Sequence, residues 1–326
     1  MTRPIFHELP LNARSNGHAG LWYEKYCNTW KFDPKWTLKA TGTTSPKLNW
    51  VNTVTGTSYV KGPGNELLTE HHKRMQSLCD GCNALQLTFK TTTRLVIGIG
   101  QDHPVENGFL WHPTLGVPYI PGSSIKGMLR NWVLGWTDQV AHTSWFESKD
   151  DKGAGELIFL DALPSDVPQL EADVITPHYG PYYREPQTQP PADWHNPVPT
   201  PFLTVAAGAE FVIRVIQRRS KPDDPFDFTP VKQALIDAFD ILGIGAKTAV
   251  GFGRLKSAGF DFEQFKRTCA GFTDFKNQGA KQIALSMELE RLSAQEQSVA
   301  VAHLLETRGQ NRSHYKRALR EIVFKT

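Results

Sequence analysis

The sequence has no long apolar run. No stretch of 18 residues is apolar enough to span a bilayer, and the segment MTRPIFHELPLN at the N-terminus lacks the apolar core of a secretory signal. We therefore expect a soluble, cytoplasmic protein without a membrane partner. A repeat of fixed period and a long low-complexity tract are also missing.

Cysteine is scarce, with only four residues in the chain: Cys27, Cys79, Cys82 and Cys269. Cys79 and Cys82 form a CxxC pair, and His71 and His72 lie just upstream, so four zinc ligands stand close in sequence. No second CxxC and no spaced histidine pair accompanies them. We expect reduced thiols near a helix end, and no metal or other cofactor.

A strong excess of charge is missing as well. The net charge of +3 is too small to indicate a polyanionic partner by itself, so any nucleic-acid surface must be local. Hydrophobic residues make up 40% and charged residues 21%, which is typical of a globular chain with a sizeable core. Several of the nine tryptophans and eight tyrosines lie in polar, proline-rich stretches, where a core has no obvious need for them.

What the sequence does contain is an ordered series of strand and helix patterns. Alternation and short apolar runs predict strands at residues 84–90, 156–161, 209–216 and about 252–258. In the first strand, Leu85, Leu87 and Phe89 point to one face. The apolar run at 156–161 is typical of a central strand.

Two amphipathic helices lie between these strands. The first follows a Pro-Gly turn, with Ser123 or Ser124 as its N-cap, and the second runs from about 229 to 242. Their apolar stripes consist of Ile125, Met128, Leu129, Trp132 and Val133, and of Val231, Leu235, Ala238 and Leu242. The order β-α-β-β-α-β predicts an α+β fold with a ferredoxin-like (RRM-like) core. Its antiparallel sheet has helices on one face, and the open face is a common RNA platform.

Additions to this core suggest three regions. Residues 1–83 form an N-terminal extension, with a helical stretch from His18 to Trp30 and a hairpin over 50–60 that turns near Thr55 and Gly56. Residues 84–262 form the core, including an insertion at 170–203 whose eight prolines predict a long ordered loop or an irregular hairpin. Residues 263–326 form a C-terminal helical extension with an apolar stripe of Tyr315, Leu319, Ile322 and Val323.

The start of the first core helix is a candidate anion site. Free backbone N–H groups and the positive end of the helix dipole favour a phosphate there, and the hydroxyls of Ser123 and Ser124 add donors. Lys126 and Arg130, one turn apart, would bring two cations to the same place, and Gly122 lets a ligand approach. The alternative is an ordinary capped helix with solvated basic residues.

A glycine-rich loop from Gly243 to Gly253 is the second candidate. Its four glycines permit positive φ, and Gly245, Lys247, Thr248 and Arg254 offer amides, charge and a hydroxyl. The spacing does not match a P-loop, and the loop follows a helix, so nucleoside triphosphate binding is disfavoured. The alternative is a mobile linker.

The third candidate is the aromatic stretch at 176–199. Rings interleaved with a cation and prolines suit stacking on unpaired bases, and the residues concerned are His178, Tyr179, Tyr182, Tyr183, Arg184, Trp194 and His195. Alternatively, the rings only fix a long loop to the core.

Two of these stretches, PYIPGSSIKGMLR at 118–130 and GIGAKTAVGFGRL at 243–255, resemble the helix motif and glycine-rich loop of the RAMP superfamily of CRISPR proteins. Within that superfamily, residues 18–25, 159–162 and 176–211 are similar to the sixth subunit of type III-B Cmr complexes. The resemblance covers most of residues 15–260.

This resemblance implies a non-catalytic RNA-binding subunit of a cytoplasmic ribonucleoprotein in antiviral defence. The implied partners are guide CRISPR RNA near its 3′ end, target RNA, the repeated backbone RAMP subunit, the small helical subunit and the first Cmr subunit. Guide phosphates would be held by Ser123, Ser124, Lys126, Arg130, Gly245, Lys247, Thr248 and Arg254. The stretch 178–195 would be a thumb-like element pressing on the guide–target duplex.

Two other functions remain open. A metal-free RNA endonuclease of the same superfamily would use a histidine such as His18, His103 or His178 as general acid or base. A structural cap would make protein contacts only. Asp102 and His103 follow the first strand region, but the surrounding GIGQDHPVENG does not match the catalytic loop of the repeated subunit, and with Glu106 and His112 they show no diagnostic metal spacing. We expect no catalysis.

Overall fold

The computed structural model describes residues 18–258, except 28, 33, 39–44, 57–58, 60–63, 138–139, 148–153, 186, 189, 193, 195 and 219–225. The chain divides into two compact units, Met1–Ser257 and Ala258–Thr326, and the described residues fall almost entirely in the first. The predicted C-terminal stripe therefore lies outside them. In the described part, no helix is long and apolar enough to cross a membrane.

The main sheet has the strand order β4-β8-β3-β9, and every neighbouring pair is antiparallel. These strands are β3 (Ala84–Thr91), β4 (Leu157–Phe159), β8 (Glu210–Gln217) and β9 (Leu255–Ser257), and the short β5 (Leu163–Pro164) also pairs with β8. The predicted mixed α/β architecture with an antiparallel sheet is confirmed. The central position predicted for residues 156–161 is wrong, because β4 lies at the edge of the sheet. Strand β4 packs against the helix Gly122–Arg130 instead.

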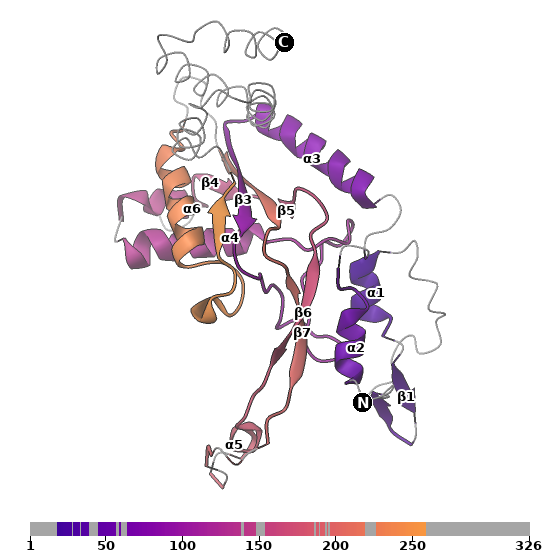
Figure 1. Cartoon of the computed structure of the whole chain (residues 1–326). Coiled ribbons are helices and arrows are strands. Elements are labelled where there is room, and N and C mark those ends of the chain that lie inside the picture. The colour runs from indigo at the N-terminus through magenta and orange to yellow at the C-terminus, as the bar shows by residue number, and fades with distance from the viewer. Residues whose placement is uncertain are drawn as a thin grey trace, which may run out of the picture. The chain divides into compact units, whose positions relative to one another are not determined.

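One face of the sheet is covered by α4 (Gly122–Arg130) and α6 (Thr229–Ile241), as Figure 1 shows. Their predicted apolar stripes point into the core, where Phe89 of β3 meets Phe239 of α6 at 4.5 Å between ring centroids. Burial of each such side chain contributes about 1.5–3 kcal/mol. After Arg130 the helix continues as a π-helical segment, Asn131–Trp136, followed by a 3-10 helix, Val140–Trp145.

The opposite face of the sheet is not open, as the sequence had suggested. Helix α3 (Gly64–Asp80), from the N-terminal extension, lies on that side of the sheet in Figure 1. Its polar side chains contact the strands. Arg214 of β8, only 3% exposed, donates to Gln86 Oε1 at 2.7 Å and lies 3.2 Å from His72 Nδ1. Helix α3 directly precedes β3 in the sequence, but its contact with β8 joins residues 142 positions apart, and alternation within the strands alone could not reveal this cover.

The rest of the N-terminal extension comprises α1 (Ala19–Lys25), β1 (Trp30–Phe32), β2 (Trp36–Leu38) and α2 (Pro46–Asn52). The predicted helix from His18 to Trp30 is therefore too long. The predicted hairpin over 50–60 is wrong, since its first three residues belong to α2. Proline at the first helical position favours this helix, and burial of Trp50 and Val51 fixes it.

The insertion forms a two-stranded hairpin, as predicted. Strands β6 (Leu170–Ile175) and β7 (Thr200–Val205) pair in antiparallel register, and the short helix α5 (Gly180–Arg184) lies at the tip. Figure 1 shows the hairpin extending away from the main sheet. At its base, a β-bridge joins Gly56 to Leu170, and Tyr59 donates to Pro168 O at 2.8 Å.

Candidate nucleic-acid interface

The start of α4 differs from the prediction. The N-cap residue is Pro121 rather than a serine, and Ser123 and Ser124 lie exposed in the first turn. The amide of Gly122 donates to Asp161 Oδ1 at 2.7 Å, so a carboxylate already lies at the helix N-terminus. Gly122 is required there, because a Cβ would lie 2.1 Å from the carbonyl oxygen of Phe159. The amide of Ser124 donates to Pro121 O at 2.9 Å, so it is also engaged within the first turn.

Both cations of α4 have partners within the chain. Lys126 donates to Phe146 O at 2.8 Å, and Arg130 lies 3.4 Å from Glu147 Oε1 in a half-exposed ion pair. Such a surface pair is weak, so Arg130 can exchange its carboxylate for a phosphate at little cost. Beside them, a Cβ on Gly127 would meet nothing within 4 Å, which leaves the helix surface open to a close ligand.

The glycine-rich loop is held by a network of backbone hydrogen bonds rather than being a free linker. Gly253 donates to Arg94 O and Ala246 to Val96 O, each at 2.8 Å. Gly245 adopts φ of +89°, and a Cβ there would lie 2.2 Å from Val96 O, so only glycine fits. The backbone of the segment that follows β3, through Arg94 and Val96, therefore holds the loop in its conformation.

The polar residues predicted in this loop lie in and beside a short 3-10 turn, η4 (Thr248–Val250). Lys247 precedes it in a left-handed conformation, with φ of 61°, and its Nζ lies 5.6 Å from the ring centroid of Phe202 in β7. Arg254 NH2 donates to Thr248 O at 3.4 Å. Thr248 is the first residue of this turn, a position whose amide has no acceptor within the turn itself.

The structure thus joins the loop to the hairpin through Lys247 and Phe202. The start of α4 is connected less directly. Helix α4 packs against α6, which leads into the loop, but no hydrogen bond or ion pair joins α4 to the loop in the described part of the chain. That one RNA strand contacts both elements stays a prediction.

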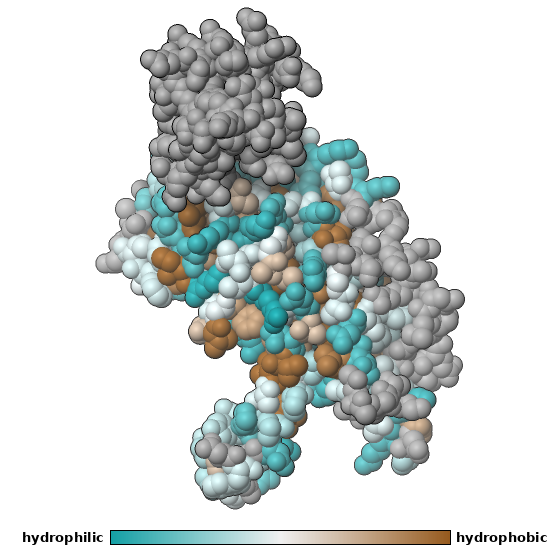
Figure 2. All heavy atoms as spheres, in the orientation of Figure 1, coloured by the Kyte–Doolittle hydropathy of each residue, from teal (hydrophilic) through white to brown (hydrophobic). Residues whose placement is uncertain are grey.

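The tip of the hairpin carries exposed rings. Tyr183 is 72% exposed and Trp194 80%, while Tyr179 and Tyr182 are half-buried. His178 and Arg184 are also exposed, and His195 lies outside the described residues. Figure 2 shows the tip as a mainly hydrophilic surface. The alternative that all the rings fix this segment to the core does not hold for Tyr183 and Trp194.

Two of the three histidines considered for catalysis, His18 and His103, have structural contacts. His18 caps α1, with Nδ1 accepting from the Leu21 amide at 3.0 Å and Nε2 lying 3.1 Å from His112 O. His103 Nε2 lies 2.9 Å from Tyr23 O, and its Nδ1 accepts from the Val105 amide. Burial lowers the pKa of His103 to about 4. Neither ring has a nitrogen left for a substrate.

The thiols and metal candidates give no cluster. Cys79 lies buried near the end of α3 and Cys82 is exposed, and no disulfide joins them. His72 is bound to Pro164 O at 2.8 Å. Across residues 18–258, apart from the gaps given above, no group of three or more histidine, cysteine or acidic side chains is arranged to hold a metal ion.

Sequence reasoning missed Arg94, Asp161 and Phe202. Each acts through a partner distant in sequence: Glu171 and Asp173 for Arg94, Gly122 for Asp161, and Lys247 for Phe202. No local pattern marks such contacts. Among these three residues, only Asp161 stands out in the sequence, because it is an acid that directly follows an apolar run.

Comparison with known proteins gives a consistent family. The sequence model of the RAMP superfamily matches residues 88–256, from β3 to β9. The CRISPR system Cmr subunit Cmr6 of Pyrococcus furiosus is 30% identical over 252 residues, which cover 58% of this chain and 73% of that protein. Cmr6 of Saccharolobus solfataricus is 26% identical over 170 residues, covering 50% and 54%.

A chain in the cryo-EM structure of the type III-B Cmr-beta complex bound to cognate target RNA is also similar. It gives a TM-score of 0.52 with 24% identity, over 65% of this chain and 70% of that one. At this identity, the similarity establishes a shared fold.

Proposed function

This chain belongs to the RAMP superfamily and resembles Cmr6, and we propose that it is a non-catalytic, RNA-binding subunit of a type III-B CRISPR effector complex. The matched region includes α4, the hairpin and the glycine-rich loop, which are the three candidate elements. In this proposal the subunit contacts guide RNA near its 3′ end and the guide–target duplex. Its protein partners are the repeated backbone subunit, the small helical subunit and the first Cmr subunit.

The core is proposed to be ferredoxin-like, with the hairpin as its thumb. The order β3, α4, β4, β8, α6 and β9, together with the strand order β4-β8-β3-β9, supports this description. Unlike an RRM with an open sheet, however, α3 covers the second face, so RNA is proposed to bind at loops and at the hairpin instead.

The observation that carries the proposal is the exposure of Tyr183 and Trp194 at the end of the hairpin. Large rings held away from the core contribute little to it, and they offer flat surfaces on which bases stack. Arg184 adds a cation beside them. Ser123, Ser124, Lys126, Arg130, Gly245, Lys247, Thr248 and Arg254 are proposed to hold the guide backbone.

The experiment is a binding measurement on the reconstituted complex with guide and target RNA. Tyr183→Ala combined with Trp194→Ala is expected to weaken target binding by at least about tenfold, since each stacked base contributes about 1–3 kcal/mol. Val198→Ala, at a 51% exposed position of the same hairpin, is the control. Unchanged affinity in the double variant would contradict an RNA role for the tip.

Two other functions give different outcomes in the same assays. A protein-only cap would assemble normally, and none of the RNA-site variants would alter affinity. A guide-processing endonuclease would cleave repeat RNA without metal, and a histidine variant would abolish that cleavage. His178→Ala is the informative change, because His18 and His103 have both ring nitrogens engaged. Absence of specific cleavage by the wild-type protein supports the non-catalytic role.

A further inference from the structure

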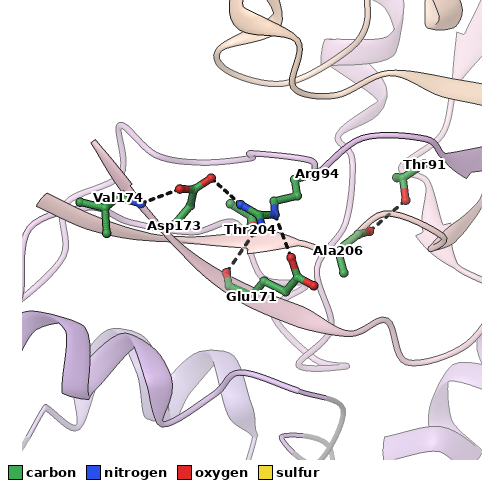
Figure 3. Close-up of polar contacts among 7 residues, drawn as sticks. All are labelled: Thr91, Arg94, Glu171, Asp173, Val174, Thr204 and Ala206. Atoms are coloured by element: carbon green, nitrogen blue, oxygen red, sulfur yellow. Dashed lines mark hydrogen bonds and ion pairs between the residues drawn. The ribbon is translucent and has the colours of Figure 1, made fainter. Parts of the chain in front are cut away.

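Arg94 connects the core to the base of the hairpin. It follows β3, and its side chain lies between two acids of β6: Nε bonds to Glu171 Oε2 and NH1 to Asp173 Oδ2, each at 2.8 Å. Glu171 and Asp173 are two residues apart, so both point to the same face of the strand. Figure 3 shows the guanidinium reaching both carboxylates.

The backbone around Arg94 holds the hairpin and the glycine-rich loop at once. Leu95 and Val205 of β7 exchange two hydrogen bonds of 2.9 Å each. On the loop side, Arg94 O accepts from the amide of Gly253, and Thr93 Oγ1 accepts from the amide of Arg254 at 3.0 Å. The segment 93–95 is therefore a common support for both elements.

We propose that Arg94 is a positioning residue that fixes the direction of the β6–β7 hairpin relative to the glycine-rich loop. The aromatic tip and the loop are then held at one separation, which suits simultaneous contact with a single RNA duplex. The RNA part of this inference rests on the proposed function; the geometric part does not.

The geometry explains why an arginine is present. A half-exposed ion pair adds little stability, but a planar guanidinium held by two carboxylates restricts direction more than a single contact does. The first residues of the hairpin are also held by backbone hydrogen bonds between Leu95 and Val205 and between Gly56 and Leu170, and the contact of Arg94 with Asp173 extends this support further along β6. Each strand residue beyond Asp173 adds about 3.3 Å, so a small rotation at the base moves the tip by several ångströms.

The test measures the distance between spin labels at Gln187 in the tip and Ala249 in the loop, using the full-length chain. Cys82 and Cys269 are replaced by serine, while the buried Cys27 and Cys79 are kept. Arg94→Gln is expected to widen the distance distribution at least about twofold, because the hairpin gains a new range of orientations. Arg94→Lys, which keeps one charged contact, should give an intermediate width.

Lys90→Gln is the matched control. It removes the Lys90–Glu210 ion pair of 3.6 Å, which also links β3 to another strand but does not touch the hairpin. Its distance distribution should equal that of the wild type. All variants should keep Tm within about 3 °C of the wild type, as exposed ion pairs contribute little. An unchanged distribution in Arg94→Gln would overturn the positioning role.

A second measurement separates this inference from the proposed function. In the reconstituted complex, Arg94→Gln is expected to weaken target RNA binding about 3–10-fold, while Arg94→Lys restores most of the affinity. If the wild-type complex binds RNA without contacting this subunit, the proposed function fails, but the distance measurement still decides the role of Arg94. If Arg94→Gln widens the distribution and affinity is unchanged, the RNA part of the inference is wrong.

Discussion

Two regions of this molecule are rich in aromatic rings, and they differ in exposure rather than composition. Near α1 and α2, the rings of Trp22, Tyr23, Trp50, Tyr59 and Trp111 are buried together. At the hairpin tip, Tyr183 and Trp194 are exposed. Both regions are interspersed with polar residues and prolines, so the sequence does not distinguish rings that stabilise the fold from rings available for binding.

The buried cluster is held by ring contacts and a few hydrogen bonds. Trp22 and Trp50 pack at 5.7 Å between centroids, Tyr23 and His103 at 4.4 Å, and Trp50 Nε1 donates to Tyr23 O at 3.1 Å. Through Tyr59 and Gly56, the same region contacts the base of the hairpin. Its rings therefore support the hairpin, whereas Tyr183 and Trp194 at the tip are exposed to solvent.

The largest expected effect is loss of stability in the buried cluster. Trp50→Ala should lower the free energy of unfolding by about 3–5 kcal/mol, because it leaves a cavity around a side chain that is 1% exposed. Urea unfolding of the full chain measures this. Tyr183→Ala, as the exposed counterpart, should change stability by no more than about 0.5 kcal/mol. Equal losses in the two variants would remove the distinction between the regions.

The second expected effect is acid destabilisation through His103. Burial lowers its pKa to about 4, so the folded protein keeps the ring neutral, while the unfolded chain takes up a proton near pH 6.5. Stability should therefore fall as pH drops from about 6.5 to about 4, by about 3 kcal/mol in total.

The measurement is urea unfolding of the wild type and His103→Gln across this pH range. The wild type should lose up to about 1.4 kcal/mol per pH unit more than the variant. Other histidines titrate in both proteins and cancel in the difference. A parallel pH dependence in the two would show that His103 is not held neutral in the buried cluster.

The smallest expected effect concerns α4, and it tests whether charge acts together with the rings of the tip. Lys126→Ala combined with Arg130→Ala should weaken RNA binding about 3–10-fold and reduce the slope of log affinity against log salt by up to about 2. The tip double variant should weaken binding without changing that slope, because stacking releases no counterions. If both affinity and slope stay unchanged for the α4 variant, the start of α4 is outside the interface, which favours a protein-only cap.

Much of the core could be predicted because its signals are local. Alternation in β3 and β8 and the 3.6-residue period in α4 and α6 identify elements whose core-facing side chains are indeed buried. The prolines and the lack of helical period at 170–203 left a long ordered loop and an irregular hairpin as alternatives, and the structure shows the hairpin. The errors concern how elements are placed in space: β4 lies at the sheet edge, and α3, although it directly precedes β3 in the sequence, covers the second face through contacts that reach β8.

The candidate site was predictable in residue type but not in geometry. The sequence singled out Ser123 or Ser124 as the N-cap, but the N-cap is Pro121, the helix begins at Gly122, and the amide of Gly122 donates to Asp161. The sequence identified the glycines of the loop. It did not show that the loop is hydrogen-bonded to the backbone of residues 93–96. Nor did it indicate that Lys247 lies against Phe202 of the hairpin.

By itself, the sequence determined the periodic elements, the family and the residue types available for binding RNA, because each depends on neighbours within a few positions or on a contiguous motif. Only the tertiary structure decided which rings are exposed, which cations are already paired, and that Arg94 joins the hairpin to the loop. Those properties depend on solvent exposure and on contacts between segments roughly 80 to 160 residues apart. No local pattern encodes such distances.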